Sequence, residues 1–146
     1  MIVARSSTPP VVLTYGLLGV VPFLLPAVAG VAFPAFKDMA GMTLALYGGL
    51  ILSFLGGARW AFANGHPAPE VGVVSLSMLP TLVALGLLMA PADDRRLQLL
   101  GIAAALTVHW VWDLRGPDLP AWYAGLRTLL TAGALVGLVA GAVTLG

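Results

Sequence analysis

Two of the few ionisable residues in this chain, His109 and Asp113, stand four positions apart within a run of apolar residues. In a helix this spacing places both side chains on one face, where an imidazole beside a carboxylate can take part in proton transfer. Arg59 lies near the end of another apolar run, at a similar depth. Because a charge at that depth is costly unless it is paired, we expect Arg59 to form an ion pair with Asp113, and Arg127 is the other candidate partner.

Two interpretations of this cluster follow from its chemistry. The first is a structural ion pair that fixes how three helices meet. The second is a working site, either a proton relay or a polar pocket for the headgroup of a quinone, a lipid or a tetrapyrrole. His109 could in principle ligate haem or a metal ion. The chain has only two histidines and no cysteine, however, so we expect no metal and no other cofactor.

The elements that position these residues follow from the composition. Of the 146 residues, 60% are hydrophobic and 9% are charged, whereas about 25% of the residues of a soluble domain are charged. Hydrocarbon therefore suits this surface better than water, and helices satisfy their own backbone groups there. The sequence predicts an all-α, polytopic membrane protein of one domain, residues 1–146, which is a bundle of five transmembrane helices at about residues 11–33, 40–62, 71–90, 97–112 and 120–145.

Prolines fall inside two of these predicted helices. Pro22 and Pro26 lie in the first helix, and Pro80 lies in the third. Each proline lacks an amide hydrogen and strains the turn before it. We therefore expect kinks at these positions, with neighbouring helices compensating for the lost hydrogen bonds.

The predicted bundle has two unlike ends. Five spans bring the start of the chain, the second loop and the fourth loop to one end, which we call the tryptophan-rich end because all four tryptophans and both histidines belong to it. Tryptophans at helix ends usually anchor a protein among the lipid headgroups. A gathering of aromatic, basic and acidic side chains is also what a ligand or partner site requires. The candidate site comprises Arg59, Trp60, His109, Asp113, Trp122, Tyr123 and Arg127.

Small residues recur at four-residue intervals on two helices. This spacing lets backbones approach closely, which is how helices associate in lipid. The second helix has Gly49, Ser53 and Gly57, where we expect contact within the chain. The last helix has a glycine stripe for which both contact within the chain and docking onto another subunit remain open. This stripe comprises Gly133, Gly137 and Gly141.

Two segments resemble a known membrane family. Residues 51–60 read Ile-Leu-Ser-Phe-Leu-Gly-Gly-Ala-Arg-Trp, and residues 119–123 read Leu-Pro-Ala-Trp-Tyr, followed by Leu126, Arg127 and Thr131. Both are similar to signatures of the family catalogued as domain of unknown function 3429. The resemblance implies a five-helix protein of the bacterial or mitochondrial inner membrane, and we expect the bacterial inner membrane. It brings no established activity. It marks as signature positions Ser53, Gly56, Gly57, Arg59, Trp60, Pro120, Trp122, Tyr123 and Arg127.

The sequence favours a non-catalytic protein. We expect a partner-binding subunit or an assembly factor of a membrane complex, because the chain has little outside the bilayer and a glycine stripe on its last helix. The alternative is a carrier or sensor of a lipid, quinone or tetrapyrrole at the tryptophan-rich end. No recognisable nucleophile–base pair or metal set supports an enzyme. The expected partners are the lipid bilayer and, within it, other membrane-protein subunits or a second copy of the chain. The net charge of +1 and the scattered basic residues argue against nucleic acid.

Overall fold

The computed structural model describes residues 7–116 and 119–146, and all regular elements among them are helical. Five of its helical segments are long and apolar enough to cross a membrane, as predicted. The elements in chain order are α1 (Pro10–Ala32), η1 (Pro34–Phe36), α2 (Lys37–Asn64), α3 (Val71–Leu76), α4 (Leu79–Leu88), η2 (Ala92–Asp94), α5 (Arg95–Leu114) and α6 (Tyr123–Thr144).

The third span is broken where the sequence predicts a distortion. Pro80 cannot donate a hydrogen bond to the carbonyl of Leu76, four residues earlier, and α3 ends at that residue. The turn is held by the Ser77 hydroxyl, which donates to the carbonyl of Val74 over 2.6 Å. In contrast, α1 stays helical through Pro22 and Pro26.

Three predicted spans have other boundaries in the structure. The second was predicted as residues 40–62, whereas α2 (Lys37–Asn64) extends beyond it at both ends. The fourth span was predicted as residues 97–112, whereas α5 (Arg95–Leu114) extends past the apolar window at both ends. Its first residue is charged, and a helix can continue into the headgroup region where such a group is solvated. The last span was predicted from residue 120, but α6 begins at Tyr123, whose amide closes a turn onto the carbonyl of Pro120 over 2.9 Å.

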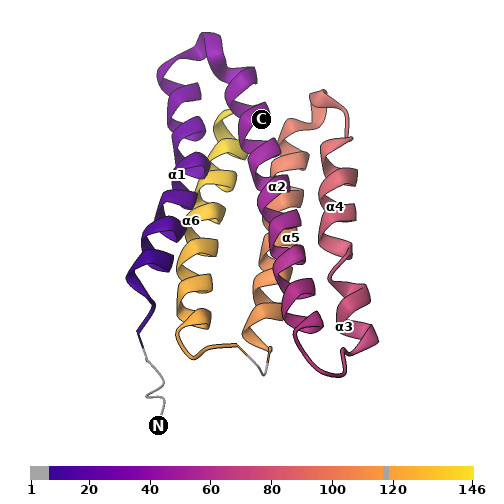
Figure 1. Ribbon diagram of the computed structural model, residues 1–146. Coiled ribbons are helices and arrows are strands. Elements are labelled where there is room, and N and C mark those ends of the chain that lie inside the picture. Colours follow the sequence, from indigo (N-terminus) through magenta and orange to yellow (C-terminus); the bar gives the residue numbers. More distant parts are fainter. Residues whose placement is uncertain (1–6, 117–118) are drawn as a thin grey trace.

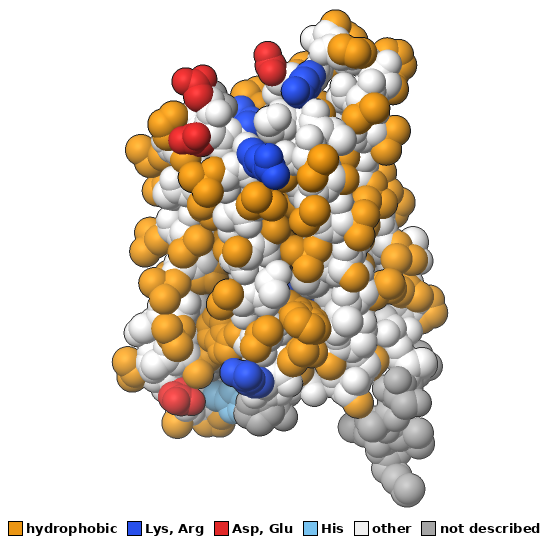
Figure 2. Space-filling view, turned by 180° about the vertical axis from the view of Figure 1, so that it is seen from behind, with side chains coloured by type: hydrophobic (Ala, Val, Ile, Leu, Met, Phe, Trp, Pro, Cys, Tyr) orange, Lys and Arg blue, Asp and Glu red, His pale blue; other side chains and the backbone are white. Residues whose placement is uncertain are grey.

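The helices form a bundle in which α2 is central. It packs against α1, α4 and α5, while α6 packs between α1 and α5 (Figure 1). The core along these contacts contains the fully buried Leu44, Leu52, Leu99, Ile102 and Leu138. Many other large apolar side chains point outward. Figure 2 shows them as a broad apolar band, with the exposed charged groups at the two ends.

The glycine stripe of α6 lies inside the bundle. A Cβ atom at Gly137 would collide with the carbonyl oxygen of Phe23 in α1, and one at Gly133 would come within 2.6 Å of Val20. A Cβ atom at Gly141 would collide with Leu44 of α2. Close contact within the chain is therefore the role of these three glycines.

The stripe of α2 is only partly as predicted. Gly49 packs against Leu88 of α4, and the hydroxyls of Ser53 and Thr81 share a hydrogen bond of 2.8 Å. Gly57, however, is exposed, and a Cβ there would meet no atom of the described residues within 4 Å. The prediction that Gly57 packs against another helix of the chain is therefore wrong. Its neighbour Gly56 fills that role, because a Cβ there would come within 2.7 Å of the carbonyl of Ser77.

Candidate functional site

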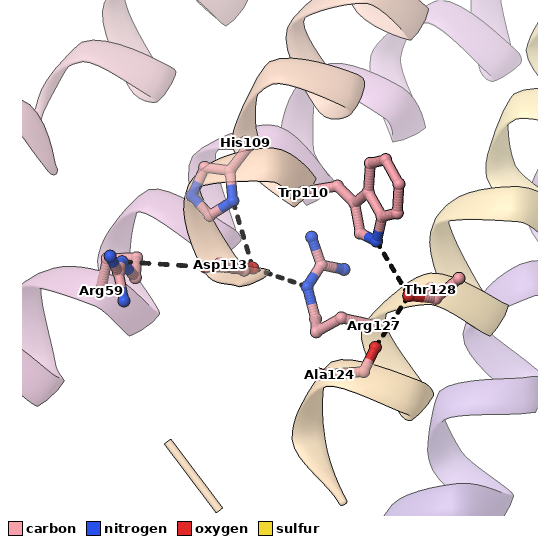
Figure 3. A network of polar contacts seen from close by, with 7 residues as sticks. All are labelled: Arg59, His109, Trp110, Asp113, Ala124, Arg127 and Thr128. Carbon is pink, nitrogen blue, oxygen red and sulfur yellow. Dashed lines mark hydrogen bonds and ion pairs between the residues drawn. The ribbon is translucent and has the colours of Figure 1, made fainter. Parts of the chain in front are cut away.

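Asp113 is the centre of a buried polar network at the tryptophan-rich end (Figure 3). Arg127 of α6 donates from Nε to Asp113 Oδ2 over 2.7 Å. Arg59 of α2 approaches the other carboxylate oxygen with its Nε at 3.7 Å. The predicted pair between Arg59 and Asp113 is therefore present, but Arg127, the second candidate, makes the closer contact. One carboxylate thus connects α2, α5 and α6.

His109 joins the network from the turn of α5 that precedes Asp113. Its Nδ1 lies 3.4 Å from Asp113 Oδ2, as the four-residue spacing on α5 predicts. The ring is almost fully buried, at 3% exposure. Its other nitrogen, Nε2, points away from Asp113 in Figure 3 and has no hydrogen-bond partner among the described residues. This nitrogen can accept or donate a hydrogen bond, depending on its protonation.

Two tryptophan rings outside the predicted site lie in or beside the network, and one of them contacts both Arg59 and His109. The Arg59 guanidinium carbon lies 4.3 Å from the centre of the Trp112 ring, a cation–π arrangement. The same indole meets the ring of His109 edge to face, with the ring centres 5.4 Å apart. Trp110 donates from Nε1 to the Thr128 hydroxyl over 3.0 Å, which further fastens α5 to α6. The three-residue spacing of His109 and Trp112 on α5 was the available signal for the contact between these two rings.

The remaining predicted site residues lie at the edge of the network. Trp60 is 45% exposed, and none of the contacts among the described residues joins its ring to Asp113. Trp122 and Tyr123 are half-buried and pair with each other at 6.1 Å, and Tyr123 also meets Phe62 at 6.3 Å. These rings lie where α6 begins, a position typical of aromatic anchors near the headgroups.

Hydrogen bonding in the network is incomplete. Two guanidinium groups face one carboxylate, and Nη2 of Arg127 and Oδ1 of Asp113 are buried without a hydrogen-bond partner among the described residues. Buried charged groups are normally saturated with hydrogen bonds. Unused donors and acceptors at this depth are features of a site that receives a ligand.

Three hollows surround the network, each beside a different member. A cleft of about 260 Å³ lies beside Arg59 and is also lined by His66 and Glu70. A groove of about 430 Å³, which we call the histidine groove, lies between α2, α3, α4 and α5 and is lined by His109 and by apolar side chains that include Leu52 and Val83. A third space of about 170 Å³, which we call the arginine hollow, lies between α1, α2, α5 and α6 beside Arg127.

Groups of three or more histidine, aspartate or glutamate side chains that could hold a metal ion do not occur among residues 7–116 and 119–146. Within this part of the chain, the network offers charge, hydrogen bonds and apolar walls. These properties suit the binding of an amphipathic molecule.

Comparisons with known proteins agree with this architecture. The family model described as "Protein of unknown function (DUF3429)" matches residues 8–143. Transmembrane protein 69 of Xenopus tropicalis is 35% identical over 93% of this chain and 55% of its own length. Transmembrane protein 69 of Mus musculus is 30% identical over 84% of this chain and 51% of its own length.

This chain therefore spans about half the length of these curated relatives. No solved structure matches it. The resemblance seen in residues 51–60 and 119–123 extends over nearly the whole bundle, Arg59, His109, Asp113 and Arg127 included. The chain belongs to the DUF3429 family of multi-pass transmembrane proteins.

Proposed function

We propose that this membrane protein is a carrier or sensor that binds a small apolar molecule in the histidine groove, and that it does so without catalysing a reaction. The observation that carries this proposal is the position of His109. It lies beside the groove with Nε2 buried and unpartnered, among walls that are otherwise apolar. Binding sites for small molecules typically combine such walls with one or two polar groups that fix orientation.

The groove suits a ligand with a largely apolar body and one hydrogen-bonding oxygen or nitrogen. Leu76, Val83 and Val108 would contact the body, and Trp112 offers the face or edge of an indole. A plain acyl chain would leave Nε2 of His109 without a partner, which costs free energy in a buried position. A quinone carbonyl or a tetrapyrrole substituent would supply that partner.

Asp113 supports this role by orienting the imidazole. Nδ1 of His109 lies 3.4 Å from Oδ2 of Asp113, so the carboxylate attracts this side of the ring, and Nε2 is left for the ligand. The two arginines hold the carboxylate in place. The ion pairs thus hold the helices and the imidazole in position, whereas the groove binds the ligand.

Our prediction of a partner-binding subunit or assembly factor has less structural support. The glycine stripe of α6 that motivated docking faces α1 and α2. A subunit role stays a prediction that native gels of the protein in mild detergent test. The bacterial inner membrane is likewise a prediction, and fractionation of the native cells tests it.

Native mass spectrometry tests ligand binding directly. The protein is purified from its own membranes in mild detergent, and the retained molecules are identified. In parallel, the thermal unfolding of delipidated protein is followed with a short-chain quinone, a tetrapyrrole and a phospholipid as probes. We expect one of these classes to be retained and to raise the unfolding temperature.

Substitutions on α5 supply the matched control. Ala105→Phe places a ring in the histidine groove, whereas Ala104→Phe places the same ring on the exposed side of the helix. We expect the first variant to lose the ligand and the second to keep it. If neither the retained mass nor the thermal shift differs between these two variants, the groove is not the binding site.

A further inference from the structure

We propose that the arginine hollow is a second, separate site, which receives the anionic head of a single-chain amphiphile. The shared chemistry is a carboxylate or phosphate at the end of one hydrocarbon chain, as in a free fatty acid or a lysophospholipid acid. Neither the family description nor the proposed function assigns this site. It lies beside Arg127, whereas the histidine groove lies beside His109.

The first argument is charge. Arg127 is 6% exposed and uses Nε for Asp113, while its Nη2 is buried with no partner among the described residues. Arg59 forms an ion pair with the same carboxylate. Two guanidinium groups therefore share one negative charge inside the bundle, and a second anion would complete the balance. Guanidinium pairs well with carboxylate and phosphate oxygens, because its donors form a planar fork.

The second argument is Thr131, one turn after Arg127 on α6. Threonines in helices usually return the hydroxyl to the carbonyl four residues earlier. Thr107, Thr128 and Thr144 do so here, at 2.8–2.9 Å. Thr14 and Thr43, which have no such bond among the described residues, are exposed. Thr131 is buried and lines the arginine hollow, and no hydrogen bond of its hydroxyl occurs within the described part of the chain. Thr131 and Arg127 thus line one space.

The third argument is shape. The α6 residues along the hollow run from Arg127 to Ala134, which are seven positions apart, or about 10 Å along the helix. On α1 the wall runs in the same direction from Tyr15 to Phe23, because α1 and α6 both start at the tryptophan-rich end. The polar groups are therefore nearest the headgroup level, and the apolar wall continues toward the bilayer centre. Tyr15 is 71% exposed, so the hollow opens to the lipid.

Binding of tritiated oleate to the protein in phosphatidylcholine nanodiscs tests this site. Unlabelled oleate, methyl oleate and lysophosphatidic acid serve as competitors. The methyl ester matches oleate in shape and lacks the charge. We expect oleate or lysophosphatidic acid to compete at least about tenfold better than methyl oleate, and the stronger of the two identifies the source of the head.

Thr131→Val is the sharpest variant, because it removes one hydroxyl and keeps the shape and the pair between Arg127 and Asp113. We expect about tenfold weaker binding of the preferred anion. Gly19→Leu fills the hollow, since the nearest atom to a Cβ there is the Tyr47 hydroxyl at 3.7 Å, and should abolish binding. Gly57→Leu adds the same side chain where no described atom lies within 4 Å, and should leave binding unchanged.

Two outcomes would overturn the proposal. One is equal competition by methyl oleate and the two acids, which would show that charge does not matter. The other is unchanged anion binding in Thr131→Val. Ala105→Phe distinguishes the two sites. It fills the histidine groove and should not alter oleate binding, which we assign to the arginine hollow. If Gly19→Leu does not fold, the comparison of Thr131→Val with the unmodified protein still decides.

Discussion

Both ends of the bundle expose charged side chains, but among the described residues only the tryptophan-rich end also buries them. At the end opposite the tryptophans, Lys37, Asp38 and Arg96 are exposed, as the charged groups at one end of Figure 2 illustrate. At the tryptophan-rich end, Arg59, Asp113 and Arg127 are buried between helices. Exposed charges near the headgroups are solvated and anchor the protein. Buried charges must find partners, so they fix helix positions and leave donors for a ligand.

The largest expected effect is at Asp113. Asp113→Ala would leave two buried arginines without their carboxylate, and removal of one partner of a buried pair costs about 3–5 kcal/mol of unfolding free energy. Titration of the micelle-bound protein with a denaturing detergent, followed by circular dichroism, measures it. Asp38→Ala is the matched change at the opposite end, where the side chain is exposed and the expected loss is below about 0.5 kcal/mol. Equal losses would remove the distinction between the ends.

A smaller effect is expected at Gln98, which is the buried polar group nearest the opposite end, at 3% exposure. Its amide nitrogen donates to the carbonyl of Leu87 over 2.9 Å, at the end of α4. Gln98→Leu should lower the unfolding free energy by about 1–3 kcal/mol, because that carbonyl loses its side-chain donor. The same detergent titration measures it. A loss of unfolding free energy as large as that of Asp113→Ala would mean that a neutral buried group stabilises this bundle as much as a charged one.

The contact between Arg59 and Trp112 should contribute less. A double-mutant cycle with Arg59→Met and Trp112→Leu isolates it, and we expect a coupling free energy of about 1 kcal/mol for a cation over an indole. The cycle with Arg59→Met and Trp60→Leu is the control, since no ring contact joins Trp60 to the network among the described residues. Equal couplings in the two cycles would contradict the geometry.

The smallest effect is expected at Arg96. This side chain is exposed at the start of α5, and Arg96→Gln should change the unfolding free energy by less than about 0.5 kcal/mol. A higher salt concentration should reduce this difference in unfolding free energy further, because exposed charges are screened. A loss above about 1 kcal/mol would reveal a buried role at this end.

Much of the fold is predictable because hydropathy decides where helices span a bilayer. The five apolar runs gave the spans, and Pro80 gave the break after α3. Which spans pack against one another was not predictable from one sequence. Gly56 and Gly57 are adjacent and chemically identical, and only the position of α4 selects Gly56 for close packing. The side of α6 that faces α1 was undecided for the same reason.

The charged members of the polar network were predictable, but the rings of Trp110 and Trp112 that contact the network or its helices were not. Helical spacing placed His109 beside Asp113, and the cost of isolated charge required an arginine partner. Spacing within one helix cannot rank partners on other helices, so Arg127 was not recognised as the closer one. Thr131 was also missed as a binding residue, because an unbonded hydroxyl becomes visible only once the neighbouring threonines are seen to bond their own helix.

The buried pair of Arg127 and Asp113 holds the tryptophan-rich end together. A double-mutant cycle of unfolding free energies with Arg127→Gln and Asp113→Asn tests it most directly. We expect a coupling of at least about 2 kcal/mol, because a direct charge pair is removed from a desolvated site. A coupling below about 0.5 kcal/mol, the value of a solvated surface pair, would contradict it.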